Sequence, residues 1–257
     1  MTHIYDHILK KMELTVHNLA ARISEPQQVP YKNSFVFRYA EKTIYQAIVQ
    51  KLARCVSGLH AVRLLMCHGF AQEQASIQRM LDELQEDVKF LSYGVILGDV
   101  TELHKRYLDD FYQEEFDADT SLASTQKRDM TPRKKIHAYL SKMGGKNSDP
   151  STHQEVSRTI SKAYSGFIHG ASPHIMDMYG GNPAKFHMNG MLDAEIHQDH
   201  EEDIWNYFYR GIMAFAFAAK AFGDEKLFAD IYEFQKDFAV KSGRDYFSAE
   251  KNQKSSL

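Results

Sequence analysis

The sequence contains only two cysteines among its 257 residues, Cys55 and Cys67. We predict that both lie in one long helix, where a separation of twelve residues places them about 18 Å apart. A disulfide requires Cα atoms within about 7 Å, so the spacing excludes a bridge between them. Reduced thiols are typical of cytoplasmic proteins, and the cytoplasm is therefore the location that we expect.

The sequence also lacks a long apolar segment and a strong excess of one charge. The longest strongly apolar run, residues 212–219, is far shorter than the ~20 residues that cross a bilayer. The N-terminal stretch carries charges throughout, unlike a secretory signal. The formal net charge is −3, which gives no overall attraction to nucleic acid or to an anionic membrane. We expect no membrane partner, and any nucleic-acid binding requires a local basic patch.

Several catalytic motifs are absent as well. The chain has no GxxxxGK[ST] phosphate loop, no HExxH, no GxSxG, no CxxC and no dinucleotide glycine fingerprint. Their absence removes the commonest kinases, zinc proteases, hydrolases and redox enzymes from consideration, but it does not remove enzymes as a class. We also find no clear alternating strand series and no internal repeat.

The dominant pattern in the sequence is helical periodicity. Apolar residues recur at helical spacing in four early ranges, which are 4–23, 35–68, 77–91 and 103–111. We predict an all-α fold, a single domain over residues 1–257 that forms a bundle of about eight helices. Within it we expect an N-terminal helix over 2–24, a core over about 35–241 and a polar tail over 242–257.

Proline and glycine mark the expected boundaries in the second half of the chain. Thr131-Pro132 and Asp149-Pro150 are predicted helix starts, and the helix that begins at Asp149 ends at Gly170. Asn189-Gly190 indicates a small hairpin. Two last helices are expected over about 192–221 and from Asp224 to about 241, and the aromatic run in the first of them predicts a buried central helix.

A basic segment, residues 127–146, follows an acidic one, residues 109–119. The basic segment holds seven Lys and Arg residues against a single acid. A phosphate-binding patch needs several cations on one face, and Lys134 and Lys135 are candidates for it. The alternative is that the two runs of opposite charge screen each other on a solvated surface.

The predicted helix that ends at Gly170 carries the strongest candidate site. Arg158, Lys162, Ser165 and His169 follow one another at spacings of four, three and four, so they form one stripe. The two cations would hold a phosphodiester, the serine would orient it, and His169 would be the general acid or base. The alternative is the ordinary polar face of an amphipathic helix with a histidine near its C-terminus.

A second candidate is a metal site. Asp193, His197, His200 and Glu201 share one face of a predicted helix, and carboxylates and imidazoles can ligate a metal. Helical di-metal proteins usually carry Glu-x-x-His pairs, which this chain lacks. Acidic residues in a first helical turn are also favoured by the helix dipole alone. We expect no cofactor, and a metal-dependent hydrolase that uses His197 and His200 remains an alternative.

Two short motifs together resemble a known family. QASIQRMLDEL at 74–84 and YSGFIHGAS at 164–172 resemble uncharacterised bacterial all-helical proteins that look related to the HEPN (higher eukaryote and prokaryote nucleotide-binding) superfamily. The resemblance implies a HEPN-like helical core, often dimeric, and it carries functional roles over to Arg79, Glu83, Ser165 and His169.

The same resemblance implies a function. Many HEPN proteins are metal-independent ribonucleases of toxin–antitoxin or phage-defence systems, and others only bind RNA or nucleotides. Their ribonuclease signature is an Arg, four to six residues and then a His, and here Lys162 stands at the position of the Arg before His169. We therefore expect an RNA-directed protein, a candidate endoribonuclease with RNA or an antitoxin as partner. The alternative is a non-enzymatic helical regulator or adaptor that binds a protein.

Overall fold

The computed structural model describes residues 2–114, 118, 122–127, 130–143, 159, 164–192 and 195–244. The helices of these ranges are α1 (Thr2–Ala20), α2 (Ile44–Cys67), α3 (Ala71–Ile96), α4 (Glu102–Phe111), α5 (Arg133–Lys142), α7 (Ser172–Met176), α8 (Glu195–Ala221) and α9 (Glu225–Lys241). Two antiparallel hairpins join β1 (Gln27–Tyr31) to β2 (Ser34–Arg38) and β3 (Tyr179–Gly180) to β4 (Lys185–Phe186). The predicted all-α bundle is confirmed.

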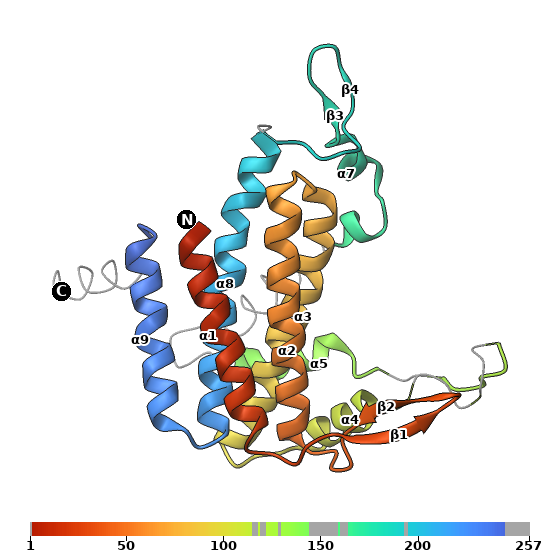
Figure 1. The fold of residues 1–257 in the computed structure, drawn as a ribbon, viewed down its shortest axis with the longest axis vertical. Helices are drawn as coiled ribbons and strands as arrows, with labels where there is room; N and C mark the ends of the chain where they lie inside the picture. Colours follow the sequence, from red (N-terminus) through yellow and green to blue (C-terminus); the bar gives the residue numbers. More distant parts are fainter. Residues whose placement is uncertain are drawn as a thin grey trace.

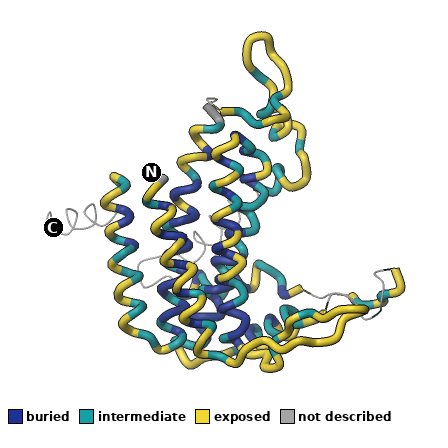
Figure 2. The backbone as a smooth tube through the Cα atoms, viewed as in Figure 1, coloured by how far each residue is buried: buried dark blue, intermediate teal, exposed yellow. Residues whose placement is uncertain are grey.

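Five long helices form the bundle (Figure 1). The helices α2, α3 and α8 pack together at its centre, α1 covers α2 and α8, and α9 covers α8. The aromatic run of α8 supplies much of the core, because Trp205, Phe208 and Phe215 are each 1% exposed or less. Burial is concentrated where the helices face one another, whereas both hairpins project from the bundle and are largely exposed (Figure 2). In the described ranges, no helix combines the length and the apolar character that crossing a membrane requires.

The second predicted helix starts later than expected, at Ile44 rather than at residue 35. The side chain of Thr43 accepts a hydrogen bond from the Tyr45 N–H (3.2 Å) and caps the helix there. The preceding residues instead pair as a hairpin, in which Val29 faces Val36 across a two-residue loop. The aromatic and β-branched residues at 35–37 favour this strand, although Phe37 also falls on the helical stripe.

Two other predicted boundaries also differ from the structure. The first helix ends at Ala20 rather than at residue 24. Pro132 takes the N-cap position of α5, and the hydroxyl of Thr131 donates to Asp110 (2.6 Å) instead of capping the helix. The predicted start at Asp149-Pro150 lies outside the described residues, while the predicted end at Gly170 is confirmed by its positive φ of 59°.

The hairpin predicted at Asn189-Gly190 is wrong, because the second hairpin is β3–β4 and its loop covers residues 181–184. Asn189-Gly190 instead lies in a turn against the α2–α3 connection. The Met191 N–H donates to the Gly69 carbonyl (2.8 Å), and a Cβ on Gly190 would lie 2.0 Å from the His68 carbonyl oxygen. Only glycine permits this approach, so the turn fixes the loop after residue 170 to the end of the bundle.

A buried histidine joins α3 to α4. The Nδ1 atom of His104 accepts hydrogen bonds from the Thr101 N–H (3.2 Å) and hydroxyl (2.8 Å), and Nε2 donates to the Phe90 carbonyl (3.1 Å). Gly94 leaves the space for this ring, since a Cβ there would lie 2.7 Å from Nε2. The neutral imidazole is therefore fully bonded, and its burial lowers the pKa of His104.

We predict that the free energy of unfolding decreases as the pH is lowered from about 7 to about 5. In the unfolded chain His104 takes up a proton near pH 6.5, whereas the buried ring resists protonation. Its contribution to stability is thus complete above that pH and is lost as the pH falls toward the pKa of the folded state. Urea unfolding at several pH values will measure the slope. The slope should be smaller in His104→Gln, and an unchanged slope would contradict this assignment.

Candidate functional site

The helix α3 carries several polar side chains that are buried inside the protein. We call the polar seam the buried residues Gln74, Gln78, Asp82, Gln85 and Asp87 together with the half-buried Glu86. They alternate along the helix with apolar residues such as Leu81, Leu84 and Val88, which belong to the hydrophobic core. The seam faces α5, α8 and residues 164–177, so it determines how these segments attach to the bundle.

Beside the first part of the seam, the side chain of Gln72 donates to the His174 carbonyl (2.6 Å) and attaches residues 164–177 to α3. The ring of Phe167 lies between those of His174 (centroids 4.3 Å apart) and His200 (5.5 Å). Gln74 donates to the His200 carbonyl (3.0 Å). A Cβ on Gly166 would lie 2.1 Å from the His174 ring, so glycine is required there. Burial lowers the pKa of His200, which identifies it as a neutral packing residue.

The middle of the seam is an ion pair between α3 and α8. Asp82 contacts Arg210 (2.7 Å) and accepts a hydrogen bond from the Tyr207 hydroxyl (3.2 Å). Burial raises the pKa of Asp82, and the positive charge of Arg210 opposes that rise. Two helical turns farther along α3, burial and the charge of Arg210 lower the pKa of Lys89 to about 8. A lysine of this kind can act as a base or nucleophile, but Lys89 does not line any of the three cavities described below.

The last part of the seam attaches α5. Arg133 forms ion pairs with both Glu86 and Asp87, an arrangement that we call the Arg133 clamp. His137 adds a contact to Glu86 (2.9 Å). Burial opposes ionisation of Glu86, but the hydrogen bond from His137 and the charge of Arg133 outweigh it and lower the pKa. Arg133 is thus part of the fold and is not available to a phosphate.

Asp87 receives two further donors beside the clamp. They are the Tyr107 hydroxyl (2.7 Å) from α4 and the Lys51 ammonium (2.9 Å) from α2. A cavity of about 210 Å³ adjoins these groups and is also lined by Asp110 and Thr131. Because each charge lining this cavity is already paired with another, the cavity has little attraction for a charged ligand.

An open groove of about 410 Å³ lies between α4 and α5 and differs from this cavity in its charge. Its lining residues are Glu102, Leu103, Arg106, Lys135, Ala138, Tyr139 and Lys142. We call it the basic groove, because it has three cations against one acid. The acid, Glu102, is paired with Lys105, and one of the cations, Arg106, contacts Asp110 (3.9 Å), which leaves Lys135 and Lys142 as the cations without an ion pair to a described residue. Lys135 and Lys142 are exposed and Tyr139 is half-buried. The groove can hold an anion beside an aromatic ring.

The four residues carried over by the resemblance lie in two places. On α3, Arg79 and Glu83 form an ion pair one turn apart (2.7 Å). Ser165 is half-buried and its carbonyl accepts a hydrogen bond from the His169 N–H (3.1 Å). The His169 side chain is exposed, and no hydrogen bond or ion pair joins it to another described residue.

The other predicted phosphate ligands are only partly described. Arg158 and Lys162 lie outside the described residues. Lys134 and Lys135 are both exposed on α5, but only Lys135 lines the basic groove.

The predicted metal ligands that the structure describes do not form a metal-binding group. His197 contacts the Met66 carbonyl through Nε2 (3.0 Å), and His200 is 6% exposed beside Phe167. Glu201 is exposed, and Asp193 lies outside the described residues. Among the side chains that the structure describes, no three or more His, Cys, Asp or Glu residues are grouped as they would be around a metal ion.

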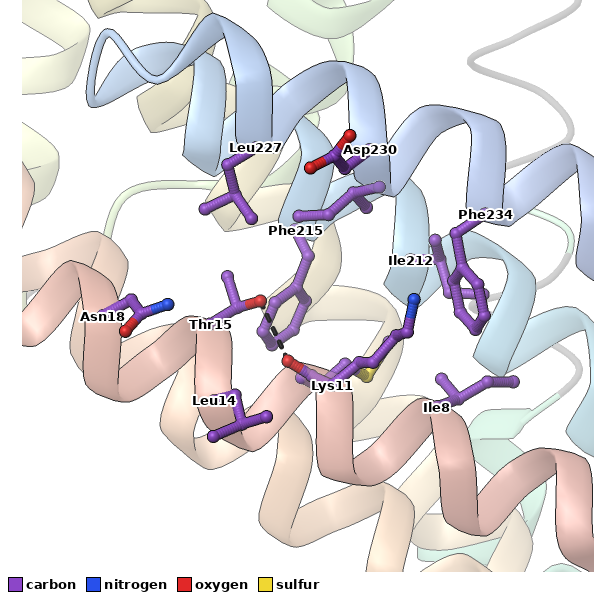
Figure 3. Close-up of a pocket in the computed structure, with 12 residues that line it drawn as sticks. Ile8, Lys11, Leu14, Thr15, Asn18, Ile212, Phe215, Leu227, Asp230 and Phe234 are labelled. Atoms are coloured by element: carbon purple, nitrogen blue, oxygen red, sulfur yellow. Dashed lines mark hydrogen bonds between the residues drawn. The ribbon is translucent and has the colours of Figure 1, made fainter.

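A further opening of about 220 Å³ lies between α1 and α9, on the other side of the bundle from α5 (Figures 1 and 3). Its floor is formed by Ile212 and Phe215 of α8. Lys11 reaches across its mouth, with Nζ 4.2 Å from the centroid of the Phe234 ring. The lining is mainly apolar, and Lys11 and Asp230 are the charged residues in it.

Sequence reasoning identified the basic segment but missed the basic groove. Spacings of three, four and seven residues place Ala138, Tyr139 and Lys142 on the same face of α5 as Lys135, and this pattern was available in the sequence. Arg106 lies on a different helix, and no local signal connects it to α5.

Comparisons of the chain with protein-family models, with curated proteins and with solved structures found no match. The function is therefore argued from the geometry and chemistry of these residues.

We predict that Arg133→Met lowers the free energy of unfolding by about 3–5 kcal/mol, because it leaves Glu86 and Asp87 buried without their main cation. The matched control is Lys105→Met, which removes an exposed partner of Glu102 and should have a much smaller effect. Urea unfolding at neutral pH measures both. Equal losses in the two variants would show that the clamp is no stronger than a surface pair.

Proposed function

We propose that the protein is a HEPN-like, RNA-directed helical protein that binds RNA through its basic groove. The observation that carries this proposal is the placement of Arg106, Lys135 and Lys142 around one groove beside the ring of Tyr139. Lysine and arginine neutralise backbone phosphates, and a tyrosine ring can stack on an unpaired base. Lys134, exposed next to Lys135, adds to the local positive charge.

Cleavage of the bound RNA is the second part of the proposal. His169 would be the general acid or base, Ser165 would orient the substrate, and Arg158 and Lys162 would hold the phosphate. The exposure of His169 favours this role, because a proton-transferring group must reach its substrate. A metal-independent ribonuclease activates the ribose 2′-hydroxyl, so RNA is cut and DNA is left intact. Such a protein would act in the cytoplasm, in a defence or toxin system, with an antitoxin as partner.

The alternative is an adaptor that binds without cleaving. The ion pair between Arg79 and Glu83 favours an adaptor, because each side chain is bonded to the other and neither is free to contact a substrate. A metal-dependent hydrolase has less support, since Nε2 of His197 is already bonded to the Met66 carbonyl.

We predict that Lys135→Ala and Lys142→Ala each weaken the binding of single-stranded RNA. Removal of one phosphate contact should lower the slope of log K against log salt by about 0.7. Fluorescence anisotropy over a salt series measures both quantities. Lys226→Ala, which removes an exposed lysine from α9, is the control and should bind as the wild type does. Loss of affinity in all three variants alike would contradict a defined groove.

His169→Ala should abolish RNA cleavage while RNA binding and the helical circular dichroism spectrum are retained. Acid–base catalysis is typically worth a factor of roughly a hundred to ten thousand, so the loss is easy to detect on a mixed RNA pool with a DNA control. EDTA should have no effect. His17→Ala, which removes an exposed histidine of α1, should cleave normally. Cleavage that survives in His169→Ala would place the catalytic group elsewhere, and a wild type that binds RNA without cutting it would favour the adaptor.

A further inference from the structure

The β1–β2 hairpin extends away from the lower end of the bundle and is largely exposed (Figures 1 and 2). It carries large apolar side chains on its surface. Phe35 is 48% and Phe37 57% exposed, and their rings contact each other edge to face (centroids 5.5 Å apart). Tyr31 is 48% exposed as well. A two-stranded hairpin is marginally stable by itself, and exposed apolar clusters on a projecting arm are typical of interaction surfaces.

The two outer edges of this hairpin are not equivalent. Proline has no N–H, so Pro30 fits a ladder only where its nitrogen points outward. Pro30 faces Phe35, and facing residues in an antiparallel pair share the same orientation, so the N–H of Phe35 also points outward. The N–H of Phe37, two residues later on the same strand, points outward as well. The outer edge of β1 thus lacks a hydrogen-bond donor at Pro30. The outer edge of β2 keeps the outward N–H groups of Phe35 and Phe37.

The outer edge of β2 pairs with no further strand in the part of the chain that the structure describes, although the Phe37 carbonyl accepts a hydrogen bond from the Arg38 side chain (2.9 Å). The sheet contains β1 and β2 only, and no backbone hydrogen bond joins the Phe35 or Phe37 N–H to another described residue. At the base of the strand, Arg38 bonds to Glu114 (2.6 and 2.9 Å), which fixes the arm against the bundle. An open edge beside exposed aromatic residues is a template for pairing with another strand.

We propose that this edge pairs with the same edge of a second copy of the chain. The two β2 strands would run antiparallel about a two-fold axis at Val36, and the two hairpins would form one four-stranded sheet. Phe35 of each copy would then face Phe37 of the other, which joins four aromatic rings on one face of the sheet. This association is independent of the RNA-binding proposal.

The sequence of β2 favours a second copy over a foreign strand. An antiparallel two-fold pairing is self-complementary, because the same residues supply both sides of the interface. Arg38, the charged residue of the strand, would face Ser34 of the other copy, so the two arginines stay at opposite ends. A parallel pairing in register would instead place Arg38 against Arg38 and the like charges would repel.

The first experiment compares two proline substitutions by sedimentation equilibrium over a range of concentrations. Phe35→Pro removes an outward N–H from β2, and Gln28→Pro makes the matched change on the outer edge of β1, since Gln28 faces Phe37. We expect dimers for the wild type and Gln28→Pro, and monomers with an unchanged helical spectrum for Phe35→Pro. A wild type that stays monomeric, or a Phe35→Pro protein that stays dimeric, would overturn the proposal.

A charge-swap experiment tests the register. Val36 lies on the proposed axis and faces Val36 of the second copy, so Val36→Lys and Val36→Glu should each repel themselves. Each variant alone should be monomeric, whereas an equimolar mixture should recover a dimer that contains one chain of each kind. Native mass spectrometry distinguishes the mixed dimer from the two homodimers. Dimers formed equally well by either variant alone would exclude this pairing.

Discussion

The Arg133 clamp holds α5 against α3, and the basic groove depends on it. Arg133 is the first residue of α5, and its guanidinium is fixed between Glu86 and Asp87. Removing the cation from a buried pair of this kind is costly, because the remaining carboxylates would lie in the protein interior without their main counter-charge. The helix α5 supplies Lys135 and Lys142, so the Arg133 clamp positions one wall of the groove although none of the clamp residues lines the groove.

The opposite end of the bundle is organised by close backbone approaches instead of by charge. Gly190 touches the His68 carbonyl, and Gly166 lies under the ring of His174. Both contacts need the absence of a Cβ. The first fixes the end of this loop to the connection between α2 and α3, and the second fixes Gly166 to His174 within residues 164–177. The position of His169 depends on these contacts, because it follows Gly166 by three residues.

The sequence predicted the long helices correctly because their apolar stripes persist over several turns. It failed at residues 35–43, where Phe37 and Ala40 continue the stripe of α2 by coincidence and only the cap at Thr43 marks the true start. For the site, the cations of α5 could be found from composition, but Arg106 comes from another helix. The role of Arg133 could not be predicted, because it depends on which face of α3 meets α5, and no local pattern specifies that packing.

The contrast between the clamp and the groove gives the protein two kinds of electrostatic interaction that respond differently to its surroundings. At physiological ionic strength the Debye length is about 8 Å, so mobile ions weaken exposed charges such as Lys135 and Lys142 much more than the shielded pairs of Arg133. A rise in salt can therefore release a polyanion from the groove while α4 and α5 keep their positions. If the groove binds RNA as proposed, its surface would stay preformed between binding events, and each new ligand would meet it without a folding step.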